Sequence, residues 1–355
     1  MPYWAWAVPA AAVALLIAAV LLPLGALLGL ACAAAMIGAV FVAVHHAEVV
    51  AHKLGEPFGT LVLAIAVTII EVALILSMMF AGGPETAALP RDTIFSAVMI
   101  ICNGVVGICL LLGALRHYEQ SFRLESANSG LATLIALSTL SLVLPSFTVS
   151  APGPFYTTAQ LAFAGVASLV LWGTFVFVQT VRHRDYFLPT GDMTGEDEHA
   201  HPPSAQQAWA SFGLLLVSLV AVVGLAKVLS PAIERAVIAA GAPQATIGIA
   251  IALLVLLPET WAAMRAAYTN RLQSSINLAI GSALASIGLT IPVVALAAVL
   301  LDRQLMLGLD PKDLVLLILT FIVAAFTLAT GRTNIMLGAV HLVLFVAFLF
   351  LALVP

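Results

Sequence analysis

GTLVLAIAVTIIEVALILSMM, residues 59–79, is an apolar run interrupted near its middle by one acidic side chain, Glu71. A second run, IGIAIALLVLLPETWAAM at residues 247–264, carries Glu259 in the same way. Both runs are long enough to cross the hydrocarbon core of a membrane as helices. A carboxylate at that depth costs roughly 2.5–3.5 kcal/mol on insertion scales, so it is retained where it meets an ion, a proton or a partner. The two glutamates are therefore the first candidates for a functional site.

The composition is that of a multi-span membrane protein. Of the 355 residues, 63% are hydrophobic and 8% are charged, whereas about a quarter of the residues of soluble proteins are charged. Cutting the chain at its charged and Pro/Gly-rich clusters leaves apolar segments that are mostly long enough to span a bilayer as helices. We expect an all-α membrane protein with about 11 transmembrane helices, near residues 4–20, 23–44, 58–81, 93–115, 130–150, 158–181, 209–229, 243–264, 275–300, 313–330 and 334–354.

The basic residues predict the orientation. With the N-terminus and the even-numbered loops on one side, that side holds eight of the thirteen Lys and Arg residues and the other side holds five. The positive-inside rule then places the N-terminus and the central loop in the cytoplasm and the C-terminus outside. We expect this to be a bacterial inner membrane. The net charge of −4 and the absence of a basic patch give no indication of nucleic-acid binding.

One hydrophilic linker divides the chain. Residues 182–207, RHRDYFLPTGDMTGEDEHAHPPSAQQ, are acidic and contain histidines. A plain solvated connector is the simpler interpretation, and a cation-sensing or buffering role is the alternative. We therefore expect an extra N-terminal helix at 1–22, a first repeat half at 23–183, an acidic cytoplasmic linker at 184–207 and a second repeat half at 208–355.

The two halves repeat a pattern. Small or polar residues recur at offsets of 7 and 4 in Ser96, Asn103 and Gly107 and again in Ser275, Ser282 and Ser286, which places each set on one helical face. Each set follows a segment with a deep glutamate. Five spans per half is an odd number, so the second copy enters the membrane upside down, as in the inverted repeats of secondary transporters. The alternative is that Ser and Gly simply favour close packing of transmembrane helices.

Three separated stretches resemble a known family. They are HHAEVVAHKLGEPFGTLVLAIAVTIIEVALI at 45–75, LLPETWAAMRAAYTNRLQSSINLAIGSALASIGLTIPVV at 256–294 and TGRTNIMLGAVHLVLF at 330–345. They are similar in sequence and order to the ChaA-type calcium/proton antiporters of the cation/calcium exchanger superfamily. The resemblance covers nearly the whole chain. It implies two inverted five-helix repeats preceded by one extra helix, with a cation site formed by the repeat regions.

The resemblance also implies the site residues. Glu71 and Glu259 match the family's glutamates and would be direct metal ligands, Asn103 and Ser282 match the first small polar ligand, and Ser286 and Gly107 match the second, although Gly107 has no side-chain oxygen. Thr68 lies in the run TIIE, where many exchangers have Gly-Asn before the glutamate, and Glu56 lies in the matched run GEPFG. The candidate cation- and proton-binding residues are Glu71, Glu259, Asn103, Ser282, Ser286, Thr68 and Glu56.

The chemistry of these residues agrees with exchange. Ca²⁺ takes six to eight oxygen ligands. Two carboxylates balance its charge and supply up to four of these oxygens. Pro258 frees the carbonyl of Leu254 as a further possible ligand, or only kinks the helix. We expect the cation and the protons to compete for the same oxygens. A protein that changes between its inward-open and outward-open states only when the charge of the site is compensated then exchanges one for the other.

We therefore expect a secondary antiporter that exports Ca²⁺ in exchange for H⁺. The alternatives are Na⁺ or K⁺ in place of Ca²⁺, or a cation channel, because paired carboxylates can also line a selectivity filter. No GK pair, HExxH motif or pair of intramembrane aspartates indicates an ATP-driven pump or a protease. We expect no enzyme activity and no cofactor; the partners are the cation, protons and the lipid bilayer, and the sequence does not indicate an oligomeric state.

Several histidines are left with two interpretations. One helical face near a membrane edge carries His45, Glu48, His52 and Glu56. This face is interpreted either as a proton relay or metal site, or simply as the hydrated end of a helix. His341 lies deep in the last span, as a functional group or as a histidine bonded to a neighbouring helix. The three cysteines, Cys32, Cys102 and Cys109, fall inside predicted spans and read as small packing residues without a disulfide framework.

Overall fold

The computed structural model describes the whole chain except residues 1, 56–57, 82–83, 189–202, 240 and 355. It is 84% helical, and the described residues form no β-strand. Within this described part of the chain, ten helices are long and apolar enough to cross a membrane, and the apolar helix Ala64–Met79 adds a shorter candidate. The predicted all-α membrane fold with about eleven spans is therefore confirmed.

Each predicted segment overlaps a helix, although two helices run ten residues beyond their predicted ends at 44 and 229. The first half of the chain contains α1 (Trp4–Leu21), α2 (Ala26–Leu54), α3 (Phe58–Ala81), α4 (Leu89–Met99), α5 (Val106–His117), α6 (Leu124–Ser138) and α7 (Thr158–Phe177). The second half contains α8 (Ala205–Ala239), α9 (Ala245–Tyr268), α10 (Leu272–Leu300), α11 (Pro311–Leu328) and α12 (Ile335–Leu353). Short π-helical turns extend three of these helices: η2 (Ile100–Val105) joins α4 to α5, η3 (Thr139–Val143) follows α6, and η5 (Val178–Arg182) follows α7.

Local sequence explains where several helices begin and end. Thr157 caps α7 in a capping box with Gln160, and the Asn334 side chain accepts a hydrogen bond from the Met336 backbone N–H at the start of α12. Pro311 opens α11, where its missing N–H has no helical partner to lose. Gly55 ends α2 with φ +69°, a conformation that favours glycine.

The chain forms two compact units. The first unit comprises Met1–Thr86 and Gly195–Val255. In it α2 packs along α8, and both α1 and α3 contact this pair. Close approach is permitted by Gly224, whose position meets the Leu16 side chain of α1, and by Gly38, which meets Val8.

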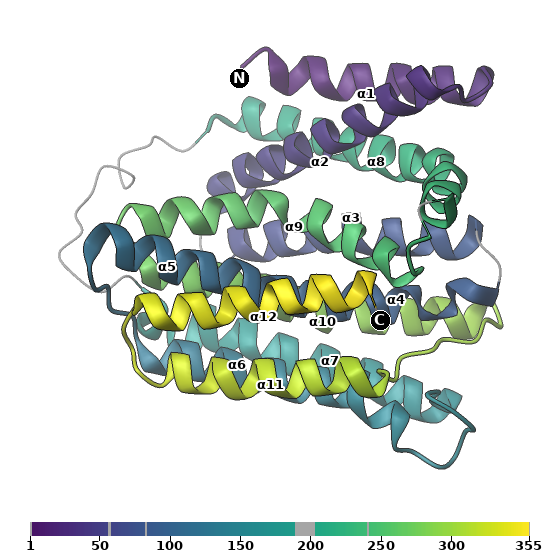
Figure 1. Cartoon of the computed structure of the whole chain (residues 1–355). Coiled ribbons are helices and arrows are strands. Elements are labelled where there is room, and N and C mark those ends of the chain that lie inside the picture. The colour runs from purple at the N-terminus through teal and green to yellow at the C-terminus, as the bar shows by residue number, and fades with distance from the viewer. Residues whose placement is uncertain (1, 56–57, 82–83, 189–202, 240, 355) are drawn as a thin grey trace. The chain divides into compact units, whose positions relative to one another are not determined.

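The second unit comprises Ala87–Thr194 and Leu256–Pro355. Its centre is α10, which contacts α4, η2, α5, α6 and α7. The last helix, α12, lies beside α5 and η2 and also contacts α11 (Figure 1). Each unit therefore combines a segment from before the central linker with a segment from after it. The predicted division into sequential repeat halves concerns sequence symmetry and stays a prediction.

Candidate cation site

Glu71 and Thr68 lie on the buried side of α3 in the first unit. Their side chains are 4% and 6% exposed, whereas Ile65 and Ile69 on the other side of the helix are 40% and 45% exposed. The Thr68 hydroxyl donates a hydrogen bond to the Ala64 carbonyl oxygen at 2.9 Å. This bond uses its only hydrogen and leaves its oxygen able to face a cation.

Glu259 lies on α9 and belongs to the second unit. Its side chain is half-buried, and Pro258 sits immediately before it within the helix. Because proline has no N–H, the Leu254 carbonyl lacks its usual helical donor. Thr260, the next residue, donates its hydroxyl to the Leu256 carbonyl at 2.7 Å. The turn before Glu259 therefore has one backbone carbonyl without its helical N–H donor.

Ser282 and Ser286 are one turn apart on α10. Ser286 is 3% exposed and Ser282 is half-buried. Thr290 continues the same stripe one turn later and is fully buried. The central helix of the second unit thus carries a row of hydroxyl groups through otherwise apolar sequence.

Asn103 is fully buried in the π-helical turn η2, where it joins a network of polar side chains from three segments. Its Nδ2 donates to the Thr320 Oγ1 of α11 at 2.8 Å, and its Oδ1 lies 3.1 Å from the His341 Nδ1 of α12. The other ring nitrogen of His341 lies 3.0 Å from the Thr327 Oγ1. Both ends of the Asn103 amide are therefore held by the last two helices.

Gly107 explains how α12 comes so close to the Asn103 turn. A Cβ atom at this position would lie 2.9 Å from the His341 Cβ and 3.1 Å from the Leu342 backbone nitrogen. Only a hydrogen fits there. Gly107 is thus a contact point between α5 and α12, which accounts for the missing side-chain oxygen at this repeat position.

The histidine and glutamate face near the end of α2 divides into different environments. The His45 ring packs against Trp4 at 4.7 Å between ring centroids, while Glu48 and His52 are exposed. Its neighbour His46 is fully buried and bonds the Ala5 carbonyl and the Ser211 hydroxyl. Glu56 lies outside the described residues. Among the described residues no three His, Cys, Asp or Glu side chains are grouped as a metal site.

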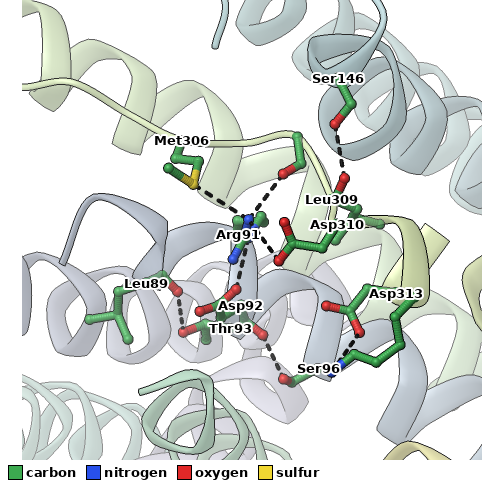
Figure 2. Close-up of polar contacts among 12 residues, drawn as sticks. Leu89, Arg91, Asp92, Thr93, Ser96, Ser146, Met306, Leu309, Asp310 and Asp313 are labelled. Atoms are coloured by element: carbon green, nitrogen blue, oxygen red, sulfur yellow. Dashed lines mark hydrogen bonds and ion pairs between the residues drawn. The ribbon is translucent and has the colours of Figure 1, made fainter. Parts of the chain in front are cut away.

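A second polar cluster surrounds Arg91 at the start of α4 (Figure 2). The buried guanidinium donates to Asp92 at 2.8 Å and to the Gly308 carbonyl at 3.1 Å, and it pairs with Asp310 at 3.6 Å. Asp310 precedes α11, and Asp313 in the first turn of α11 pairs with Lys312. The cluster ties the beginnings of α4 and α11 to the loop between α10 and α11.

The predicted residues are thus distributed over both units. Glu71 and Thr68 belong to the first; Glu259, Asn103, Ser282 and Ser286 belong to the second. Sequence reasoning missed Thr320 and Thr327, although their spacing of seven places both on one face of α11. Of the two interpretations of His341, the structure supports the one in which its side chain is hydrogen-bonded to neighbouring helical segments. Asn277 of α10 also makes a long-range hydrogen bond, because its side chain donates to the Phe187 carbonyl at 2.7 Å.

Comparison with known proteins gives consistent matches along the chain. The sodium/calcium exchanger protein family matches residues 24–181 and 210–354. A Sinorhizobium fredii protein proposed to be an ionic transporter, y4hA, is 48% identical over 100% of this chain and 97% of its own length. The Escherichia coli sodium-potassium/proton antiporter ChaA is 35% identical over 88% of this chain and 85% of its own length.

A solved structure shares the fold. The H⁺/Ca²⁺ exchanger CAX superposes with a TM-score of 0.73 at 13% identity, covering 98% of this chain and 87% of that chain. Its similarity concerns the fold alone. The family match and the Escherichia coli relative show that the chain is an integral membrane antiporter of the exchanger type, not an enzyme, and that it belongs to the sodium/calcium exchanger protein family.

Proposed function

We propose that this protein exports Ca²⁺ in exchange for H⁺ and that Glu71 and Glu259 act together on the transported ion. The observation that carries the proposal is the depth of these two carboxylates in apolar helices, Glu71 in α3 and Glu259 in α9. Two carboxylates balance the charge of one divalent cation, and the same oxygens take up protons when the cation leaves. Cation and proton then exclude one another.

The neutral ligands of the proposal are the hydroxyls of Thr68, Ser282 and Ser286 and the amide of Asn103. Ca²⁺ accepts a large and flexible set of oxygen ligands, so hydroxyl, amide, carbonyl and water oxygens complete its shell. Glu56 stays in the proposal as a candidate proton-binding carboxylate, on the ground of its place in the sequence run GEPFG. No resident cofactor is needed, because the cation and the proton are themselves the cargo.

A second candidate is exchange of Na⁺ or K⁺ for H⁺. It is favoured by the name of the Escherichia coli relative, a sodium-potassium/proton antiporter that is 35% identical over most of this chain. A monovalent ion would leave one carboxylate to hold a proton or a second ion.

The basic residues favour a cytoplasmic N-terminus, and the bacterial relatives favour a bacterial inner membrane.

The proposal is tested with purified protein in liposomes that carry an imposed pH gradient. Ca²⁺, Na⁺ and K⁺ are offered separately, and cation and proton fluxes are recorded together. We expect proton-coupled Ca²⁺ accumulation that is abolished by Glu71→Gln and by Glu259→Gln, because an amide keeps the volume but carries no charge and accepts no proton.

The matched control is Glu125→Gln, which changes an exposed glutamate in the first turn of α6 and should leave transport unchanged. Coupled movement of Na⁺ or K⁺ without Ca²⁺ would select the second candidate. Either buried-glutamate variant exchanging Ca²⁺ at the parental rate, when correctly inserted, would refute the role of the carboxylates.

A further inference from the structure

The network around Asn103 has a direction. An amide oxygen only accepts hydrogen bonds, so the contact of 3.1 Å between Asn103 Oδ1 and His341 Nδ1 requires a hydrogen on Nδ1. In a neutral imidazole the other nitrogen, Nε2, is then an acceptor, and it receives the Thr327 hydroxyl hydrogen at 3.0 Å.

The same direction continues through the other end of the amide. Asn103 Nδ2 donates a hydrogen bond to Thr320 Oγ1 at 2.8 Å, and the Thr320 hydroxyl donates one to the Met99 sulfur at 3.4 Å. All four polar side chains, Asn103, Thr320, Thr327 and His341, are fully buried. A buried network is stable when every member is satisfied, and this one is satisfied with His341 neutral.

Turning the Asn103 amide over would break this arrangement. Nδ2 would then face the hydrogen of His341 Nδ1, and this contact would join two donors. Restoring the bonds would require the imidazole hydrogen to move to Nε2 and the Thr320 hydroxyl to turn away from Met99. The His341 tautomer therefore decides which atom of Asn103 is the oxygen and where that oxygen points.

His341 also leaves the Asn103 oxygen partly available. A carbonyl oxygen has two lone pairs, and the His341 N–H uses one of them. The second can bind a cation. Residues that hold a ligand in this way, without touching the ion, orient the ligand, and their loss typically weakens ion binding about 10–100-fold.

We propose that His341 is a positioning residue for transport: its Nδ1–H fixes the amide of Asn103 so that the oxygen is presented to the cation. The contact between Gly107 and His341 holds the imidazole in reach of the amide. This inference rests on the proposed role of Asn103 as a neutral cation ligand. It assigns the buried histidine of the last span a role in cation affinity and none in carrying the transported proton.

Two substitutions separate positioning from a general structural role. Asn at position 341 places an amide N–H near the former Nδ1, whereas Gln places its amide near the former Nε2. We expect His341→Asn to keep the apparent KM for the cation within about twofold of the parental value and His341→Gln to raise it about tenfold, both with little change in maximal rate. The pH dependence of transport should be the same in His341→Asn and in the parent.

The double variant tests whether His341 acts through Asn103. In an Asn103→Ala background, His341→Gln should add no further increase in KM. A full additional increase would overturn the inference, as would a parental KM in His341→Gln. Loss of proton coupling in His341→Asn would also overturn it, by making the imidazole the proton carrier.

A measurement independent of transport checks the tautomer. Nitrogen-15 NMR of histidine-labelled protein, with His341→Asn used to assign the signal among the eight histidines, should show hydrogen on Nδ1 and none on Nε2. A hydrogen on Nε2 would overturn the inference. Glu71→Gln is assayed beside these variants: exchange at the parental rate in Glu71→Gln would refute the proposed function, whereas an inactive Glu71→Gln with a parental His341→Gln would refute only the positioning role.

Discussion

At the scale of single residues, charged and neutral ligands of a cation site differ in what their loss costs. Removing one hydroxyl oxygen from a flexible Ca²⁺ shell is partly offset by water, whereas removing a carboxylate removes charge and proton uptake together. We therefore expect Ser282→Ala and Ser286→Ala each to raise the apparent KM for Ca²⁺ roughly fivefold, which corresponds to about 1 kcal/mol, with little change in maximal rate. Concentration-dependent uptake into proteoliposomes measures both constants.

The control for these hydroxyls is Ser218→Ala on α8. Ser218 is fully buried and lies in the first unit, and its hydroxyl donates to the Leu214 carbonyl of its own helix at 2.8 Å. Its loss should leave the KM unchanged. Parental KM values in both Ser282→Ala and Ser286→Ala would remove this face of α10 from the proposed site.

The sequence predicted the burial of some candidate residues but not the hydrogen-bond partners of others. The burial of Glu71 and Thr68 follows from their place in a long apolar run, because a helix of that composition buries its polar side. The partners of Asn103 could not be derived in this way. Thr320 and His341 lie 217 and 238 positions further along the chain, and helical periodicity carries no information about which distant helices meet.

At the scale of helices, the contact between α5 and α12 is set by Gly107. Alanine at this position would place its Cβ 2.9 Å from the His341 Cβ. Overpacking of this kind costs about 1–3 kcal/mol and would push α12 away from the Asn103 turn. We expect Gly107→Ala to lower the melting temperature in detergent and to raise the KM for the cation. Gly173→Ala on α7 is the matched control, since no atom lies within 4 Å of its added Cβ; an equal loss in both variants would contradict the contact argument.

The starts of α4 and α11 depend on Arg91. Its pair with Asp92 is nearly buried, with side-chain exposures of 8% and 12%, and breaking a buried pair by removing one partner costs roughly 3–5 kcal/mol. Arg332 and Glu119 pair at 3.1 Å with side-chain exposures of 67% and 50%. An exposed pair contributes about 0–1 kcal/mol. Arg91→Met should therefore lower thermal stability strongly and Arg332→Met hardly at all, as measured by thermal unfolding in detergent.

The helix boundaries show what patterns predict and what they miss. The expected span at 93–115 is present, but it consists of α4, the π-helical turn η2 and α5, and its helical part begins at Leu89. Apolar composition fixes the existence of a span because the bilayer requires helix there. The π-helical turn contains Asn103, whose contacts with α11 and α12 are long-range in sequence, so the apolar pattern alone does not show it.

At the scale of the whole molecule, chain order and compact units do not coincide. Met1–Thr86 packs with Gly195–Val255, and Ala87–Thr194 packs with Leu256–Pro355. The apolar spans were accessible from sequence, because the length and composition of each span are local properties. Which segments form a compact unit depends on packing between residues far apart in the chain. Local patterns in a single sequence do not reveal that packing.

The transport cycle of the whole protein yields a last prediction. If one Ca²⁺ replaces two protons on Glu71 and Glu259, the site carries the same net charge in both transport steps. Exchange should then be electroneutral, with two protons moving opposite to each Ca²⁺, and a membrane voltage should not change its rate. Reversing the pH gradient should reverse net Ca²⁺ movement. Simultaneous Ca²⁺ and proton fluxes in voltage-clamped liposomes test both points, with the inactive Glu71→Gln variant as the baseline for leak. Ca²⁺ movement that continues without proton movement would instead identify a channel. A voltage-dependent rate with one proton moved per Ca²⁺ would show that only one of the two carboxylates exchanges its proton.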